Sequence, residues 1–165
     1  MKVELQSLIG KINFIQRFIS NLSGKIQPLC SLLKFKNNQK FIWGEAQQLA
    51  LEEIKQYLTS PPVLVPPQKH KPFKLYLSAY ERAIGSALIP EFEGKERVIY
   101  FVSRRLLDAE TRCSPVERLC LCLYFSCTKL RHYLLSAECV VLSKDDVIKY
   151  MLSLSILNGK IGKWI

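Results

Sequence analysis

The chain has 165 residues, 48% of them hydrophobic and 23% charged, and these proportions exclude a long disordered or collagen-like protein. No apolar run approaches the roughly 20 residues of a membrane-spanning helix, and residues 1–7 do not resemble a secretory signal, so we expect an intracellular protein with no membrane partner. Lys and Arg number 24 against 14 Asp and Glu, and a net charge of +10 on a folded surface favours contact with nucleic acid.

The first sixty residues carry apolar side chains at helical spacing. Residues 3–20 place them three and four positions apart, which predicts an amphipathic helix that ends at a breaker cluster over 21–24. Pro28 can start a short helix, and residues 45–58 repeat the helical period. Residues 1–60 are therefore predicted to form a small all-helical unit.

Prolines crowd the next segment. Pro61, Pro62, Pro66 and Pro67 exclude a helix and favour an extended chain. We therefore expect residues 61–72 to form a Pro-rich linker between two domains.

After this linker the hydrophobic period becomes that of strands. Residues 73–77, 83–89 and 98–102 are predicted to be strands, with a hairpin turn over 91–95 between the last two. Gly85 lies inside the second of these strands, and a glycine there indicates a bulge or a close approach of two backbones.

A complete helix-start pattern follows at Ser114-Pro115-Val116-Glu117, with Ser at the cap, Pro at the first helical position and Glu three residues after the cap. The helix is expected to run to about Tyr133. Residues 139–142 are predicted to be a fourth strand, and residues 147–152 another helix. Residues 73–165 thus predict a mixed α/β domain with a central sheet, and the whole chain is expected to be α+β.

Three of the six cysteines, Cys120, Cys122 and Cys127, are close enough in sequence to be considered as part of a zinc site. However, the only histidines are His70 and His132, and no second cysteine pair lies at zinc-finger spacing. Cys120 and Cys127 are seven residues apart on an apolar helix, a spacing that suits small core residues. We therefore expect free, mostly buried thiols and no metal.

Several motifs occur in a fixed order along the chain. They are Leu5–Ile19, Pro28–Lys34, Phe41–Trp43, Thr59–Leu64, Ala83–Leu88, Tyr100–Arg104, Lys129–Leu134, Leu142–Tyr150 and Asn158–Trp164. In this order they resemble the end of the reverse transcriptase and the adjoining ribonuclease H-like domain of gypsy-type LTR retrotransposon Pol polyproteins, and they are most similar to the versions of plant elements. The resemblance implies a reverse transcriptase thumb-like segment over 1–60 and a ribonuclease H-like domain over 73–165, truncated at its C-terminal end.

Active relatives cut the RNA strand of an RNA–DNA hybrid with two Mg²⁺ ions held mainly by carboxylates. The resemblance places three of these carboxylates at positions that are Ser78, Leu119 and Ser143 in this sequence. Alcohols and a hydrocarbon cannot supply the negative charge that holds two Mg²⁺ ions together. We therefore expect no cofactor and a catalytically degenerate domain. The polymerase palm would precede residue 1, so polymerase activity is not expected either.

Nearby acidic residues leave an alternative open. Glu117 lies two residues before Leu119, about 200° around the helix, and is better explained as the capping partner of Ser114. Asp145, Asp146 or Glu110 could supply replacement ligands, which would make the domain a weakly active Mg²⁺-dependent ribonuclease.

Two further functions remain. Binding of an RNA–DNA hybrid or other nucleic acid would use basic residues against phosphates; the candidates are Arg104, Arg105, Arg112, Lys129, Arg131, Lys34, Lys36 and Lys40. Tyr80, Phe101 and Tyr133 could stack on bases, although such aromatic residues usually belong to the core. A protein–protein interaction remnant would instead expose Phe14 and Phe18 of the first helix.

Overall fold

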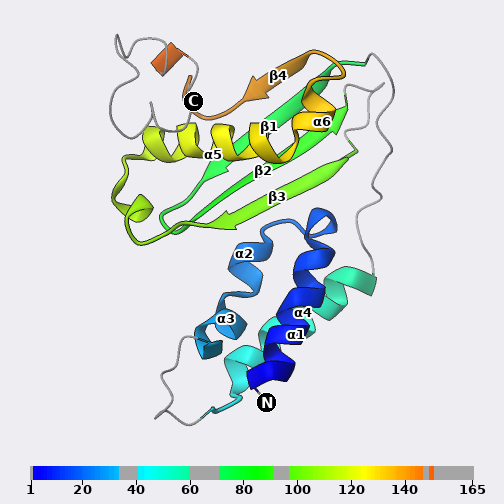
Figure 1. Ribbon diagram of the computed structural model, residues 1–165, viewed down its shortest axis with the longest axis vertical. Coiled ribbons are helices and arrows are strands. Elements are labelled where there is room, and N and C mark those ends of the chain that lie inside the picture. Colours follow the sequence, from blue (N-terminus) through cyan, green and yellow to red (C-terminus); the bar gives the residue numbers. More distant parts are fainter. Residues whose placement is uncertain (1, 34–40, 60–70, 91–96, 147–148, 151–165) are drawn as a thin grey trace.

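The structure, a computed structural model, describes residues 2–33, 41–59, 71–90, 97–146 and 149–150 (Figure 1). Its helical unit is built from short helices that bury one apolar side each around a common core. These elements are α1 (Lys2–Phe14), η1 (Gln16–Phe18), α2 (Leu22–Lys25), α3 (Gln27–Leu33) and α4 (Glu45–Thr59). The expected helices after Pro28 and over 45–58 are confirmed.

The prediction of one continuous helix over 3–20 is wrong beyond Phe14. From Ile15 onward the backbone forms tighter bonds between residues three apart, such as Ile19 N–H to the Gln16 carbonyl at 3.1 Å. Ile19, at the end of this tighter turn, is completely buried. The predicted breaker cluster over 21–24 instead holds the turn α2, which Asn21 precedes in the left-handed conformation, with φ of 48°.

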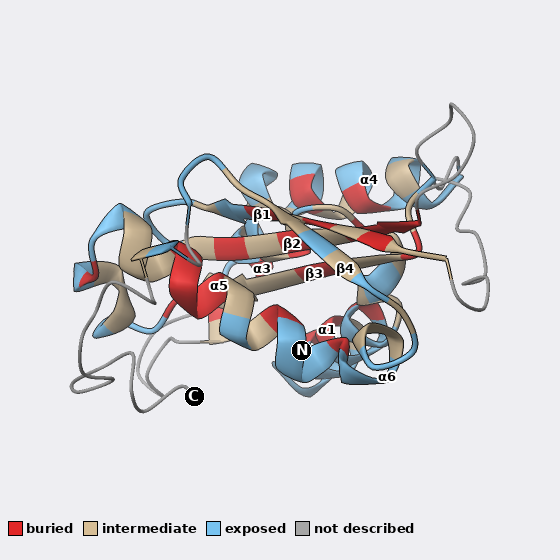
Figure 2. Ribbon diagram, turned by 90° about the horizontal axis from the view of Figure 1, so that it is seen from above, coloured by how far each residue is buried: buried red, intermediate tan, exposed pale blue. Residues whose placement is uncertain are grey.

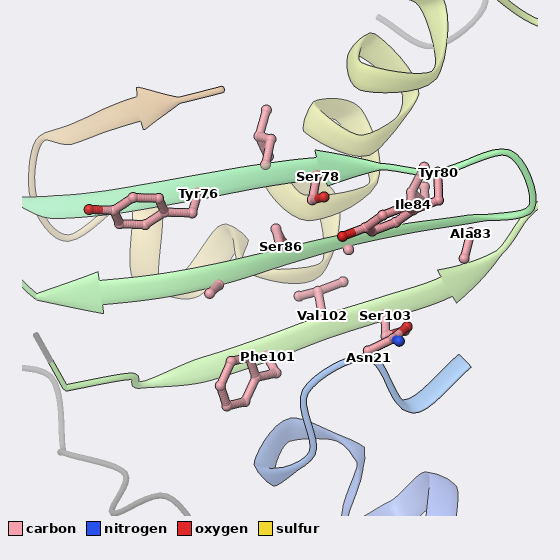
Figure 3. A pocket seen from close by; sticks show the side chains of 13 residues that line it. Asn21, Tyr76, Ser78, Tyr80, Ala83, Ile84, Ser86, Phe101, Val102 and Ser103 are labelled. Atoms are coloured by element: carbon pink, nitrogen blue, oxygen red, sulfur yellow. The ribbon is translucent and has the colours of Figure 1, made fainter. Parts of the chain in front are cut away.

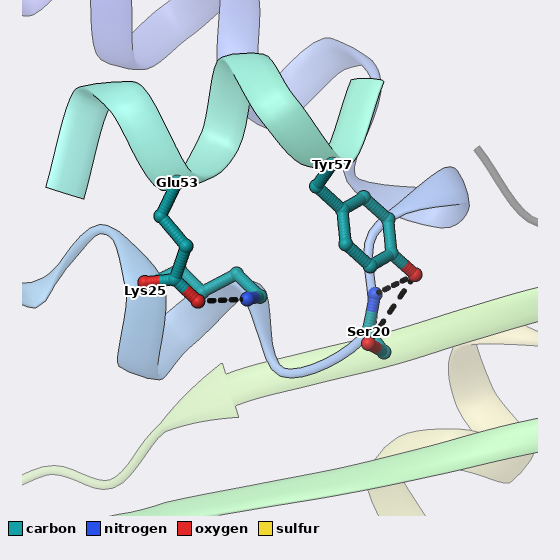
Figure 4. A network of polar contacts seen from close by, with 4 residues as sticks. All are labelled: Ser20, Lys25, Glu53 and Tyr57. Atoms are coloured by element: carbon teal, nitrogen blue, oxygen red, sulfur yellow. Dashed lines mark hydrogen bonds and ion pairs between the residues drawn. The ribbon is translucent and has the colours of Figure 1, made fainter. Parts of the chain in front are cut away.

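Polar contacts connect α4 to α2 and to the segment just before it (Figure 4). The Ser20 N–H donates to the Tyr57 hydroxyl at 3.2 Å, and Lys25 forms an ion pair with Glu53. The Lys25 ammonium also lies 5.3 Å from the centre of the Tyr57 ring. These contacts fix the segment that the helical unit presents to the sheet.

The second half is a four-stranded sheet with one long helix on one face, as the alternating sequence predicts. The strands are β1 (Phe73–Ala79), β2 (Ala83–Pro90), β3 (Tyr100–Arg105) and β4 (Cys139–Leu142), in the order β3-β2-β1-β4. β1 pairs antiparallel with β2 and parallel with β4, and β2 pairs antiparallel with β3. The prediction of an α+β chain with a mixed sheet is confirmed.

The third strand lies later in the chain than predicted. It was expected over 98–102, but the ladder begins where Tyr100 pairs with Leu88 and continues through Arg104 and Arg105. A prediction from apolar residues alone places the strand too early, because polar residues extend it at its C-terminal end.

The long helix α5 (Pro115–Lys129) begins with the expected capping box. Glu117 N–H donates to the Ser114 hydroxyl at 3.3 Å, and Ser114 N–H donates to the Glu117 carboxylate at 2.7 Å. The helix ends at Lys129 rather than near Tyr133, and the separate turn α6 (Arg131–Leu134) follows. Buried residues lie along the strands and in α5, whereas the outer sides of the helices are exposed (Figure 2).

The helical unit lies beside β3, one of the two edge strands of the sheet (Figure 1). Both η1 and α2 contact β3, and Ser23 N–H donates to the Ser103 hydroxyl at 3.0 Å. No helix in the described ranges is long and apolar enough to cross a membrane. The predicted linker over 61–72 lies outside the described residues except for 71 and 72. The turn over 91–95 and most of the helix over 147–152 also lie outside them.

Candidate functional site

The topology brings together the three elements on which relatives carry metal-holding carboxylates. Because β1 and β4 are parallel neighbours, their C-terminal ends lie at the same end of the sheet. The first turn of α5 reaches this end too, since the Arg118 guanidinium donates to the Tyr80 carbonyl just after β1 at 2.8 Å.

The side chains at the three corresponding positions, Ser78, Leu119 and Ser143, do not converge. Leu77 is buried in the core beneath α5, so the next residue, Ser78, faces the opposite side and is exposed. Leu119 is 5% exposed and belongs to that same core. Ser143 turns its hydroxyl to the Asp145 backbone carbonyl. A hydrocarbon and two alcohols that face different surroundings do not fit a pair of Mg²⁺ ions.

Two of the neighbouring acidic residues, Glu110 and Asp146, have structural partners. Glu110 accepts two bonds from Arg104, at 2.7 and 3.0 Å, and a third from Leu107 N–H at 2.7 Å. Asp146 accepts from Lys149 N–H at 2.9 Å. Within the described ranges, no three His, Cys, Asp or Glu side chains gather closely enough to hold a metal ion.

The cysteines of α5 divide between core and surface. Cys120 and Cys122 are fully buried, as expected, and burial raises the pKa of both thiols to about 11. Cys122 also lies 3.2 Å from the Gly85 carbonyl. The prediction that Cys127 is a core residue is wrong, because it lies in the last turn of α5, beside the four-residue edge strand β4, and is exposed. Buried, protonated thiols such as these are inert rather than reactive.

A hollow of about 390 Å³ lies on the face of the sheet opposite α5, here called the open face (Figure 3). Three adjacent strands and one residue of the helical unit line it. The lining residues are Asn21, Tyr76, Leu77, Ser78, Tyr80, Ala83, Ile84, Gly85, Ser86, Ala87, Phe101, Val102 and Ser103.

Small residues of β2 create the hollow. Ala83, Gly85 and Ala87 alternate with residues that face α5, so the open face of this strand carries almost no side chain. A Cβ added to Gly85 would lie 3.2 Å from the Val102 carbonyl oxygen. This bears out the close backbone approach predicted at Gly85; the pairing there is continuous, without a bulge.

Two of the three candidate stacking residues share the hollow. Tyr80 is 67% exposed, and Figure 3 shows its ring reaching back over β2. Phe101 lies half-buried on the opposite wall. Tyr133 does not reach the hollow: its ring packs edge-on against Tyr100, with 6.2 Å between ring centres, on the side of α5.

The predicted basic residues do not form one patch. Arg104 faces α5, where it pairs with Glu110 and lies 5.2 Å from the centre of the Phe125 ring. Arg105 therefore faces the open side, opposite Ala83 of the hollow.

Arg112 is exposed just before α5. The other two described residues, Lys129 and Arg131, are exposed at the far end of α5, roughly 20 Å away along a 15-residue helix. Lys34, Lys36 and Lys40 lie outside the described residues.

Sequence reasoning missed Asn21 as a site residue. The segment over 21–24 was interpreted only as a helix breaker, yet Asn21 lines the hollow from the helical unit. Asparagine tolerates the left-handed backbone better than most residues, and that preference was the available signal.

Residues 43–141 match the family model described as the RNase H-like domain found in reverse transcriptase. Over 164 residues, or 98% of the chain, it is 27% identical to the retrovirus-related Pol polyprotein from transposon 297 of Drosophila melanogaster and covers 15% of that protein. It is 31% identical over 132 residues, 79% of the chain, to the transposon Tf2-3 polyprotein of Schizosaccharomyces pombe, of which it covers 10%. The chain thus spans only a small part of the curated relatives that it matches.

Solved structures share the fold. The chain superposes on the foamy viral protease-reverse transcriptase in complex with RNA/DNA hybrid with a TM-score of 0.81 and 23% identity, covering 99% of this chain and 22% of that one. The same enzyme in complex with dsDNA gives a TM-score of 0.80 and 23% identity, covering 98% and 34%. Because the family model matches more than half of the sequence, the chain belongs to the family of RNase H-like domains found in reverse transcriptases.

Proposed function

We propose that this chain is a retroelement RNase H-like domain that binds nucleic acid without cutting it. One observation carries the proposal. The three positions that hold metal-binding carboxylates in active relatives are Ser78, Leu119 and Ser143, and their side chains face different surroundings. Without clustered negative charge, two divalent ions cannot be held beside a scissile phosphate.

Binding is supported by charge. The net charge is +10, and Arg105, Arg112, Lys129 and Arg131 have no ion-pair partner among the described residues. Such residues bind phosphates regardless of the base sequence, and the affinity falls as the salt concentration rises. Solved structures of the same fold include complexes with dsDNA and with an RNA/DNA hybrid, which makes a hybrid the first ligand to test.

The order of the sequence motifs supports a gypsy-type LTR element of the plant kind as the origin. The flanking DNA provides the test. A polymerase palm encoded in frame upstream would agree with this origin, and an unrelated upstream reading frame would contradict it.

A cleavage assay tests the absence of catalysis. The protein is incubated with a labelled RNA–DNA hybrid in Mg²⁺ or Mn²⁺, beside a triple variant carrying Ser78→Asp, Leu119→Glu and Ser143→Asp, which should also stay inactive because the three side chains face different surroundings. We expect no cleavage by the unaltered protein, but binding of the hybrid that weakens steeply between low and high salt. Metal-dependent cleavage that disappears in a variant with Glu110→Gln, Asp145→Asn and Asp146→Asn would instead establish a weakly active ribonuclease.

One observation favours a protein–protein function as the second candidate. Phe14, at the end of α1, is 86% exposed, whereas Phe18 is half-buried within the helical unit. Sedimentation of the unaltered protein and of Phe14→Ser tests it. Oligomers that dissociate in the variant would support this function, and a monomer at all concentrations would remove it.

A further inference from the structure

We infer that the open-face hollow is a subsite for one unpaired nucleobase, with Tyr80 as the stacking surface, Asn21 as the hydrogen-bonding group and Arg105 as the phosphate contact. The inference rests on the proposed nucleic-acid binding and adds the part of the nucleic acid that is recognised. The lining offers aromatic rings, an amide and hydroxyls, but no carboxylate. This combination suits a flat ring with a polar edge better than an aliphatic chain or a metal ion.

Tyr80 is held in place although its ring is exposed. Its N–H donates to the Ala83 carbonyl at 2.8 Å, and its carbonyl accepts from Arg118 at 2.8 Å. The ring itself remains 67% exposed beside the hollow. A fixed backbone that presents an exposed ring reduces the entropy lost when a flat ligand stacks on it.

Asn21 has a side-chain amide with no hydrogen-bond partner among the described residues. It occupies the cap position of α2, where an asparagine usually bonds to the helix backbone, yet it makes no such bond. It is also the one non-glycine residue with positive φ in the described part of the chain. A Cβ at Gly24 would lie 2.8 Å from the Asn21 amide nitrogen, so the glycine leaves space for this amide. An unusual backbone that places a free amide at a hollow indicates a binding role.

Arg105 supplies positive charge at the same place. It pairs across the strands with Ala83, which lines the hollow, and has no ion-pair partner among the described residues. Arg82 and Glu81 lie in the turn that follows Tyr80, so that the three charged residues Arg105, Arg82 and Glu81 carry a net positive charge. A base in the hollow would therefore have its phosphate near a surface of net positive charge.

The geometry selects an unpaired base. In a duplex each base is covered by its neighbours on both faces, so neither face can stack on a protein ring. A single-stranded end or a bulged nucleotide leaves one face free. If the hollow instead bound a second copy of this chain or another protein segment, the affinity for nucleic acid would not depend on whether a base is paired.

Fluorescence anisotropy with two labelled RNA–DNA hybrids of equal charge tests the inference. One hybrid is fully paired, and the other carries a single bulged nucleotide. We expect the unaltered protein to bind the bulged probe about tenfold more tightly. Tyr80→Ala and Asn21→Gly, which keeps the left-handed backbone, should each remove most of this preference without changing the affinity for the paired probe. Tyr80→Phe should retain it.

The matched control is Tyr124→Ala, which removes a tyrosine 40% exposed on α5, on the other face of the sheet. Its preference should equal that of the unaltered protein. Equal affinity of the unaltered protein for the two probes, with normal salt dependence, would overturn the subsite and leave the proposed function standing. Equal losses of the preference for the bulged probe in Tyr80→Ala and Tyr124→Ala would also overturn the subsite. No binding of either probe would contradict the proposed function itself.

Discussion

The two faces of the sheet use the same three strands for opposite purposes. Towards α5 the strands present Phe73, Leu75 and Leu88, all fully buried. Two buried hydroxyls on that side pair with each other, those of Ser86 and Ser126, with 2.7 Å between their oxygens. The alternate residues on the open face are small, hydroxylic or aromatic and leave a hollow. One face stabilises the fold, and the other is available for binding.

This division indicates that a carboxylate substituted at only one of the three positions, Ser78, Leu119 or Ser143, would not build a metal site. Ser78 belongs to the open face, whereas Leu119 belongs to the closed core. A carboxylate at position 119 would be buried among apolar side chains, where an unpaired charge is strongly unfavourable. A carboxylate at this position would therefore also require a change in the packing around Leu119.

The largest expected effect comes from truncating the closed face. Leu75→Ala should lower the free energy of unfolding by about 2–5 kcal/mol, because Leu75 is fully buried and its loss leaves a cavity. Urea-induced unfolding measures the change. Tyr80→Ala on the open face is the matched comparison and should change stability by less than about 0.5 kcal/mol. Similar losses in both variants would refute the division between the faces.

The second expected effect concerns the buried hydroxyl pair. Ser126→Ala alone should cost about 1–3 kcal/mol, because it leaves the Ser86 hydroxyl buried without its partner. Adding Ser86→Ala should recover most of that loss, since no polar group then remains unsatisfied. A double-mutant cycle by urea unfolding measures the coupling. Strictly additive losses would show that the two hydroxyls do not depend on each other.

The third effect is a pH dependence that arises on the closed face. Burial raises the pKa of Cys120 and Cys122 to about 11 from an ordinary 9.0, so the unfolded chain releases these protons more readily. The stability should be unaffected below about pH 8 and fall as pH rises towards 11, by about 1.4 kcal/mol for each thiol at pH 10. Thermal unfolding from pH 8 to 10 measures it. Replacing both cysteines with alanine should flatten the dependence, and an unchanged slope in that variant would assign it to other groups.

Much of the fold could be predicted because it depends on local patterns. The capping box at Ser114 and Glu117 is specified by residues three positions apart, and the strands by alternation. The end of α1 and the extent of β3 were missed because tertiary contacts decide them. Arg104 and Arg105 extend β3 because Glu110 pairs with one and the open face accommodates the other.

The candidate site could be predicted only in part. Ser78, Tyr80, Phe101 and Gly85 were all identified from the sequence, and the structure places them at one hollow. Alternation divides a strand into two faces but does not say which face a helix will cover. The sequence therefore could not show that Ser78 lies on the open face whereas Leu119 lies in the core under α5. The part played by Asn21 depends on a backbone angle and on contact between distant segments.

The smallest expected effect on stability comes from two neighbouring arginines on opposite faces. Arg104→Ala should destabilise the protein by about 1 kcal/mol, because the half-buried Glu110 then keeps only its bond from Leu107 N–H, and should not change the salt dependence of hybrid binding. Arg105→Ala should change stability by less than about 0.5 kcal/mol. It should reduce the slope of log affinity against log salt by about 1, as expected when one phosphate contact is lost. Anisotropy titrations at several salt concentrations measure the slopes, and the reverse assignment of the two effects would place the nucleic acid on the side of α5.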